Sequence, residues 1–185
     1  MSLKNPFKIL VVFDLNGTLM TRLNAKEYRV FKKANSIAPD FTVNKSKVFK
    51  RPHWDKFLEA LMKLPHIEVA VWTSAQPNNA VPLTEKLFGK YVNRLQFILD
   101  RSHCEDAPMG VKVDTAVKNL ELTNTILVDD SKSKAKKQTE NLVEIPTFDV
   151  TISSSDDFLL VLLNWLSTLK PGDVRETIRE NSPFQ

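Results

Sequence analysis

Polar residues with chemical potential follow apolar runs in four places in the sequence. Asp14 directly follows the first run, Thr73 a second, and the pair Asp129-Asp130 a later one, while Lys112 comes after a loop that follows another run. Short apolar runs rich in β-branched residues are typical of buried parallel strands. Because the carboxyl ends of parallel strands meet at one edge of a sheet, where open α/β folds bind ligands, we expect these side chains to share a site.

These residue types favour phosphoryl transfer. Two carboxylates can hold one Mg²⁺, which prefers one or two carboxylates together with waters and phosphate oxygens. The hydroxyl of Thr73, the backbone N–H groups of the loop around Gly17 and the ammonium of Lys112 can surround a phosphoryl group. A carboxylate can accept that group as an aspartyl phosphate, so the pattern favours Asp14 as the nucleophile.

Each of these residues also has a simpler structural explanation. Asp14 could cap a turn, and Thr73 and Ser74 could cap the helix that follows them. Lys112 could be a solvated surface residue, as most lysines are. One member of the Asp129-Asp130 pair is expected to be structural.

The dipeptide Asn16-Gly17 offers an alternative for the first strand, because Asn-Gly is the strongest short signal for a β-hairpin. The rest of the chain alternates strands and helices, which indicates βαβ units. Four segments would then deliver polar groups to one sheet edge, so we reject the hairpin.

The expected architecture is a single α/β domain over residues 1–170, with a parallel sheet flanked by helices and an irregular insertion at about 20–50. The insertion is expected to hold a short helix near 25–33 or a small antiparallel element near 42–49. From Pro171 the composition turns polar, which predicts a loosely held tail. Strands are expected at 7–13, 67–72, 95–99, 125–128 and 142–145, and helices at 52–65, 76–88, 114–120, 132–140 and after Ser153-Ser154-Ser155.

Composition bounds the class of protein. The chain has 185 residues, 42% of them hydrophobic, and a net charge of +4. We expect a reducing compartment, since Cys104 is the single cysteine and no internal disulfide is possible, and no membrane span or signal peptide. A monomer is also expected. The basic run of Lys132, Lys134, Lys136 and Lys137 is interpreted as a solvated helix face, with attraction of an acidic substrate as the alternative. A nucleic-acid role would rest only on this mild positive charge.

The motifs resemble the haloacid-dehalogenase superfamily. DLNGTL, beginning at Asp14, is similar to its DxDGT signature, and further segments resemble the branch that contains the RNA polymerase II C-terminal-domain phosphatases. The similarity covers roughly residues 8–169. Those further segments are KRPHWDKFLEAL (50–61), VAVWTSAQP (69–77), DRSHC (100–104) with VKVD (111–114), and ILVDDS (126–131).

The resemblance implies a Rossmann-like sheet with a small insertion instead of a large cap, and a Mg²⁺ cofactor. Asp14 would be the nucleophile and a metal ligand. The backbone carbonyl of Asn16 and the Asp130 carboxylate would be the other protein ligands, and Asp129 would support them.

The resemblance also implies a substrate site. Thr73 and Lys112 would bind the phosphoryl group, with Lys112 also pairing with the nucleophile, and Leu15, Thr18 and Ser74 would contribute to substrate binding. Relatives without a large cap act on phosphoserine or phosphothreonine in exposed peptides, among them the C-terminal domain of RNA polymerase II. A nuclear or cytoplasmic location follows by analogy only.

Position 16 departs from the family pattern, which has an aspartate as general acid/base there. The amide of Asn16 has no proton to exchange near neutral pH. Three interpretations follow: a slow phosphatase, a binding module without turnover like the degenerate domain of a mitochondrial presequence-translocase subunit, or an asparagine introduced to trap substrate. Losing a general acid/base slows a reaction by about 10²–10⁴-fold.

Overall fold

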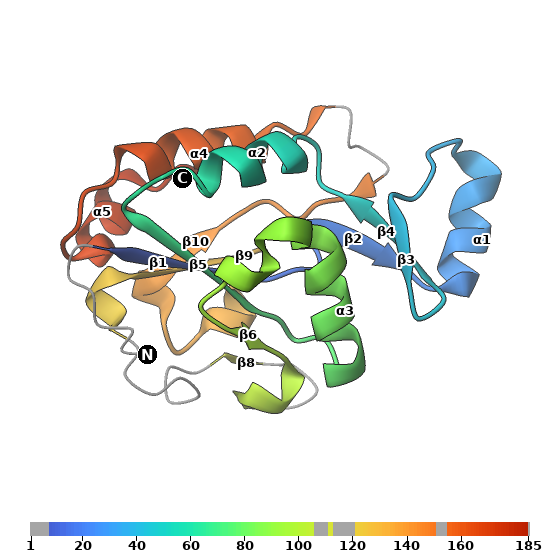
Figure 1. Cartoon of the computed structure of the whole chain (residues 1–185), viewed down its shortest axis with the longest axis horizontal. Helices are drawn as coiled ribbons and strands as arrows, with labels where there is room; N and C mark the ends of the chain where they lie inside the picture. Colours follow the sequence, from blue (N-terminus) through green and yellow to red (C-terminus); the bar gives the residue numbers. More distant parts are fainter. Residues whose placement is uncertain (1–7, 106–110, 113–120, 151–154, 185) are drawn as a thin grey trace.

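The computed structural model describes residues 8–105, 111–112, 121–150 and 155–184. A five-stranded sheet lies at its centre, in the order β10-β9-β1-β5-β6, and neighbouring strands are parallel throughout. The chain therefore has the expected α/β fold with a parallel sheet (Figure 1). The strands are β1 (Ile9–Phe13), β5 (Ile67–Trp72), β6 (Ile98–Leu99), β9 (Thr125–Asp129) and β10 (Leu142–Glu144).

Strand β1 is buried on both faces, as its continuous apolar sequence predicts. Ile9, Val11 and Phe13 belong to the larger core, which lies beneath the helices, whereas Leu10 and Val12 belong to a smaller core on the opposite face. Asn16-Gly17 does not close a hairpin, because the partners of β1 are the parallel strands β5 and β9. The hairpin alternative is therefore excluded.

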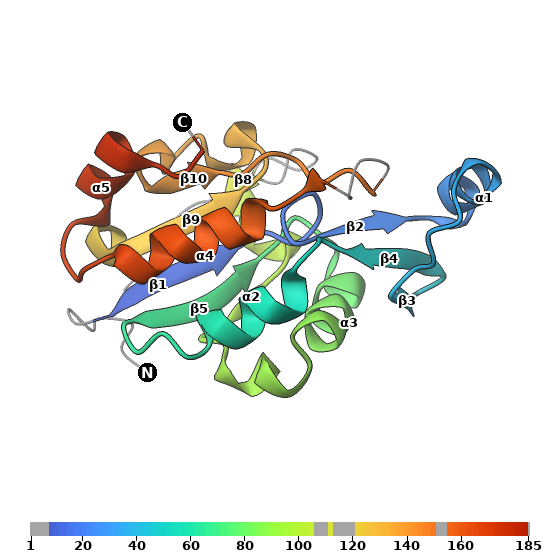
Figure 2. The same cartoon turned by 90° about the horizontal axis from the view of Figure 1, so that it is seen from above.

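Helices α2 (Trp54–Leu61) and α4 (Phe158–Thr168) lie side by side over one face of the sheet (Figure 2). Apolar residues at helical spacing bury one face of each helix. Helix α3 (Pro77–Phe88) joins the same core, and the indole N–H of Trp54 donates to the backbone oxygen of Leu87 at 3.0 Å. Among the helices that the structure describes, none has the length and apolar character needed to span a membrane.

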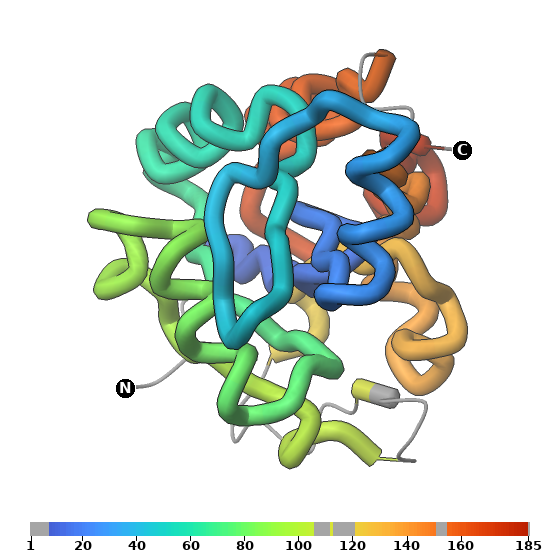
Figure 3. Tube along the Cα trace, turned by 90° about the vertical axis from the view of Figure 1, so that its right-hand side faces the viewer, coloured from blue at the N-terminus to red at the C-terminus, as the bar shows by residue number. Residues whose placement is uncertain are grey.

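The insertion contains both elements that the sequence offered as alternatives. Its helix is α1 (Ala25–Ala34), begun by a capping box between Asn24 and Glu27. Its strands are β2 (Met20–Leu23), β3 (Phe41–Val43) and β4 (Ser46–Lys50), in the antiparallel order β2-β4-β3. Figure 3 shows the insertion in front of the central sheet, on the side of the strands' carboxyl ends.

Several predicted elements are shorter than expected. The third strand is only two residues long, and the predicted charged helix at 132–140 is replaced by two 3₁₀ helices, η5 (Lys132–Ala135) and η6 (Thr139–Asn141). Only Ala135 of η5 is buried, so this segment lacks the apolar stripe that would support a longer helix. The predicted helix at 114–120 and Ser153-Ser154 lie outside the described residues.

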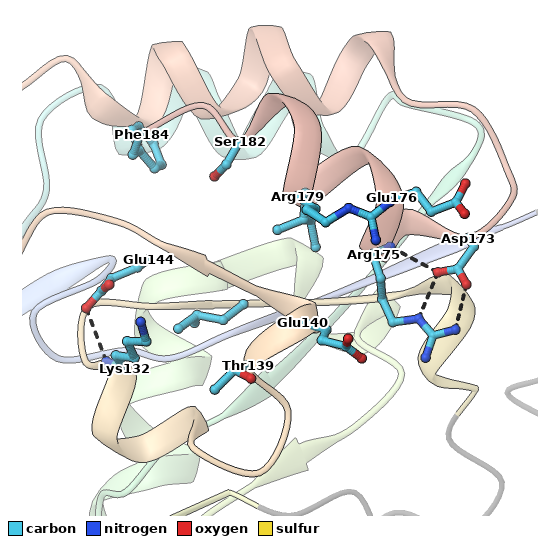
Figure 4. A pocket seen from close by; sticks show the side chains of 12 residues that line it. Lys132, Thr139, Glu140, Glu144, Asp173, Arg175, Glu176, Arg179, Ser182 and Phe184 are labelled. Carbon is cyan, nitrogen blue, oxygen red and sulfur yellow. Dashed lines mark hydrogen bonds and ion pairs between the residues drawn. The ribbon is translucent and has the colours of Figure 1, made fainter.

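The prediction of a loose tail after Pro171 is wrong. Residues Val174–Asn181 form helix α5, which buries Val174 and Ile178, four positions apart. Asp173 caps it, and the indole N–H of Trp165 donates to the backbone oxygen of Asn181 at 2.6 Å. A pocket of about 590 Å³ lies between α5 and the 132–144 segment. Figure 4 shows its lining side chains, with Arg175 directed toward Asp173.

Candidate active site

Asp14 lies at the carboxyl edge of the sheet, one residue beyond β1. Its backbone N–H donates to the oxygen of Val128 at 2.9 Å, which continues the pairing of β1 with β9. The side chain is 1% exposed. Such a carboxylate needs a compensating charge or a hydrogen-bond donor.

Lys112 supplies that charge. The β-bridge between β7 (Cys104–Glu105) and β8 (Val111–Lys112) places Lys112 opposite Cys104, with its side chain completely buried. Its ammonium lies 3.1 Å from Asp14 Oδ1 and also donates to Asp129 Oδ2. The alternative of a solvated surface lysine is therefore wrong for Lys112.

The buried charges of Asp14, Lys112 and Asp129 influence one another's pKa values. Burial opposes ionisation of Asp14, but the ammonium groups of Lys112 and Lys134 outweigh it, so the pKa of Asp14 lies below its ordinary value. Burial likewise disfavours the charged form of Lys112, yet Asp14 and Asp129 raise its pKa. Burial, together with the nearby Asp14, raises the pKa of Asp129 to about 6. Asp14 is therefore an anion paired with a cation at neutral pH.

Three carboxylates converge where a divalent cation would fit. One oxygen each from Asp14, Asp129 and Asp130 lie within 4.8 Å of one another. Within the described residues, Asp130 Oδ1 is buried and accepts no hydrogen bond. Hard oxygen donors, one of them without a hydrogen-bond donor, suit Mg²⁺.

The loop after β1 fixes Asp130. The hydroxyl of Thr147 donates to Asp130 Oδ2 at 3.0 Å, and the backbone N–H of Asp130 donates to Thr18 Oγ1 at 3.1 Å. Gly17 has a φ of +86°, and a Cβ atom there would lie 2.6 Å from Asp130 Cγ. Only glycine allows the loop to approach this carboxylate so closely.

The loop residues proposed from sequence divide into two groups. Asn16 is exposed, and its Oδ1 accepts a hydrogen bond from the N–H of Arg22 at 3.0 Å. The side chains of Leu15 and Thr18 are completely buried, the first in the core and the second against Asp130. The structure therefore brings Asn16 to the surface and leaves Leu15 and Thr18 beneath the site.

Thr73 follows β5 directly, on the strand next to β1, and is 1% exposed. Its N–H donates to the oxygen of Leu99 at 2.9 Å, and its hydroxyl oxygen accepts from the N–H of Ala75 at 3.2 Å. Gln76 is the N-cap of α3, without a side-chain capping bond. Neither Thr73 nor the half-buried Ser74 therefore caps that helix.

Lys134 is the site residue that sequence reasoning did not single out. Its ammonium lies 3.4 Å from Asp14 Oδ2, 3.9 Å from Asp129 Oδ1 and 3.8 Å from Asp130 Oδ1. Its side chain is only 20% exposed. The sequence signal that could have identified Lys134 is its position four residues after Asp130, which itself directly follows a strand. Lys134 is therefore not a solvated lysine.

A buried ion pair between Arg51 and Asp156 supports the loop that follows β1. Arg51 Nε donates to both oxygens of Asp156, at 3.0 and 2.9 Å. Its Nη1 donates to the backbone oxygen of Thr18 at 2.9 Å, and its Nη2 to that of Pro146 at 2.6 Å. One guanidinium thus joins the loop after β1, the segment after β10 and the approach to α4.

Comparison with known proteins identifies relatives with this architecture. A family model described as NLI interacting factor-like phosphatase matches residues 9–179. A CTD phosphatase-like protein of Invertebrate iridescent virus 3 is 25% identical over 188 residues, covering 91% of this chain and 100% of the viral one.

Solved structures agree on the fold. Fcp1, an essential RNA polymerase II CTD phosphatase, matches with a TM-score of 0.58 at 12% identity, over 96% of this chain and 49% of the Fcp1 chain. Fission yeast Fcp1 bound to beryllium fluoride matches with a TM-score of 0.59 at 12% identity, over 88% and 47% of the two chains. The chain thus spans about half the length of these proteins, and the likeness is one of fold. Since the family model covers nearly all of it, the chain belongs to the NLI interacting factor-like phosphatase family.

Proposed function

We propose that the protein is a Mg²⁺-dependent phosphoserine/phosphothreonine phosphatase that works slowly through a phospho-aspartate at Asp14. The observation that carries this proposal is the buried, ionised carboxylate of Asp14, paired with Lys112 beside two further carboxylates. Asp14, Asp130 and the backbone carbonyl of Asn16 would hold Mg²⁺, which would neutralise charge on the phosphoryl group.

The first chemical step is attack of the Asp14 carboxylate on phosphorus. A bond forms between Asp14 and the phosphoryl group, and the bond to the serine or threonine oxygen breaks. Lys112 keeps Asp14 anionic, and Thr73 and Lys112 would bind the phosphoryl oxygens, with backbone N–H groups of the loop and Ser74 beside them. The leaving oxygen requires a proton.

The second step returns Asp14 to its carboxylate. Water attacks phosphorus, the bond to Asp14 breaks and orthophosphate leaves, while the water gives up a proton. An aspartate at position 16 could donate the first proton and accept the second, whereas the Asn16 amide can do neither. Turnover should therefore be slow although the nucleophile is in place.

A groove beside the site supports a peptide substrate. It has a volume of about 940 Å³ and runs between α1, β2 and residues 147–150. Thr147, which holds Asp130, also lines it. An extended phosphopeptide could lie along this groove with its phosphate at Asp14. The names of the viral relative and of Fcp1 make the C-terminal domain of RNA polymerase II a candidate substrate.

The alternative is a phosphopeptide-binding module without turnover, and Asn16 is the observation that favours it. The same geometry would also serve as a substrate trap if Asn16 had been introduced. A phosphate-release assay on a phosphoserine peptide and an aryl phosphate, with Mg²⁺ or with EDTA, separates these cases. Many turnovers that require Mg²⁺ and are abolished in Asp14→Asn support the phosphatase. Mg²⁺-dependent peptide binding without release supports the module.

A further inference from the structure

Lys134 lies among three carboxylates of the candidate site. Its ammonium approaches one oxygen of each of Asp14, Asp129 and Asp130 within 3.4–3.9 Å. These are the same three side chains that converge within 4.8 Å of one another. Lys137, in the same run of lysines, instead pairs with Glu105 at 3.1 Å.

Charge balance makes Lys134 a competitor of a metal ion. Three carboxylates face two ammonium groups, Lys112 and Lys134. Lys112 is completely buried between Asp14 and Asp129. Its displacement would leave two buried carboxylates without their closest cation. Lys134 is attached through a flexible, partly exposed side chain and makes its three contacts at longer distances.

A divalent ion and the Lys134 ammonium cannot both keep these contacts. The charges of Mg²⁺ and Lys112 together would balance those of the three carboxylates. The Lys134 ammonium, if it stayed 3.4–3.9 Å from the carboxylate oxygens, would then be repelled by the metal. The Lys134 side chain can turn toward solvent, because one fifth of its surface is already exposed.

We propose that Lys134 is a tethered internal cation that occupies the acidic cluster until Mg²⁺ displaces it, and so weakens the affinity of the protein for Mg²⁺. This inference rests on the metal site of the proposed function. It concerns the affinity for the metal and not the chemical step.

Calorimetric titration with Mg²⁺ tests the proposal without any substrate. Lys134→Gln should bind Mg²⁺ about ten-fold more tightly than the unaltered chain, since one competing charge–charge interaction is removed. Lys132→Gln is the matched control, because it removes the same charge two residues away and outside the cluster, and should change the affinity little. Equal affinities for Lys134→Gln and the unaltered chain would overturn the inference while leaving the metal site intact. No Mg²⁺ binding by any of these proteins would overturn the metal site and the inference with it.

Acylation of the unaltered protein gives a second readout, independent of whether a variant folds. Brief treatment with an acetylating reagent, followed by mass spectrometry of the peptide containing residues 132–137, measures the reactivity of each lysine. Mg²⁺ should increase the reactivity of Lys134 several-fold, because displacement exposes its amine, and leave that of Lys132 unchanged. Reactivity of Lys134 that does not respond to Mg²⁺, in a protein shown by calorimetry to bind it, would contradict the displacement.

Discussion

The side-chain oxygen of Asn16 accepts a hydrogen bond of 3.0 Å from the backbone N–H of Arg22, at the middle of β2. A carboxylate oxygen can accept the same bond, and the remainder of the side chain is exposed. Aspartate at this position should therefore keep the orientation that Asn16 has now.

Asn16→Asp should accordingly raise the rate of phosphate release from a phosphoserine peptide by about 10²–10⁴-fold, the usual contribution of a general acid/base. An aryl phosphate, whose leaving group needs less protonation, should gain less. Equal rates for the two proteins would show that position 16 does not limit turnover. The control is Asp14→Asn in the Asn16→Asp protein, which should abolish the gain. Peptide mapping should verify that the unaltered chain still carries asparagine at position 16.

Much of the fold follows from local sequence patterns. Apolar runs end at Asp14, Thr73 and Asp129, and the structure places all three at the same edge of a parallel sheet, because strand order does not change which end of a strand faces that edge. The buried face of α2 is equally evident from helical spacing.

Other features depend on contacts between distant segments. Asp156 lies 105 residues from its partner Arg51, so no local pattern connects them. Helix α5 is stabilised by two apolar residues, Val174 and Ile178, in an otherwise polar segment, too weak a signal to outweigh composition. Lys134 belongs to a run of lysines, and its ion pairs depend on the contact between η5 and β9, which no local pattern specifies.

Removal of the buried ammonium should destabilise the protein strongly. Lys112→Met leaves the carboxylates of Asp14 and Asp129 without their closest cation, which should lower the free energy of unfolding by about 3–5 kcal/mol. Urea denaturation in EDTA measures this loss, and addition of Mg²⁺ should recover part of it. The surface substitution Lys63→Met, which breaks an exposed pair with Glu59, is the control and should have no measurable effect. Unchanged stability of Lys112→Met would contradict the central ion pair.

Asp129 should give the metal-free protein a distinctive pH dependence. Its folded pKa of about 6 lies above the ordinary value of 3.8, so between these values the folded state binds a proton that the unfolded state has released. Stability should therefore fall as the pH rises from about 4 to 6, by about 3 kcal/mol from this group. Asp129→Asn should lack this component when both proteins are unfolded with urea in EDTA. Identical pH profiles would argue against the raised pKa of Asp129.

The Arg51–Asp156 pair should behave as a buried ion pair. Arg51→Met removes one partner and three groups of hydrogen bonds, which should cost about 3–5 kcal/mol of unfolding free energy. Asp156→Asn should cost less, because the amide oxygen still accepts from the guanidinium. The two changes together should cost less than the sum of their separate effects, and strict additivity in denaturation experiments would contradict a direct interaction.

His53 should be a site of backbone strain. His53 has a φ of +66° at the N-cap of α2, without a side-chain capping bond. A residue with a Cβ atom is disfavoured in this left-handed region, so His53→Gly should raise the free energy of unfolding by about 1 kcal/mol, although glycine also gains entropy in the unfolded chain. His53→Ala removes the same side chain but keeps the Cβ atom, so it should give no such gain. If the alanine and glycine variants are equally stable in thermal and urea denaturation, the left-handed conformation carries no cost at this position.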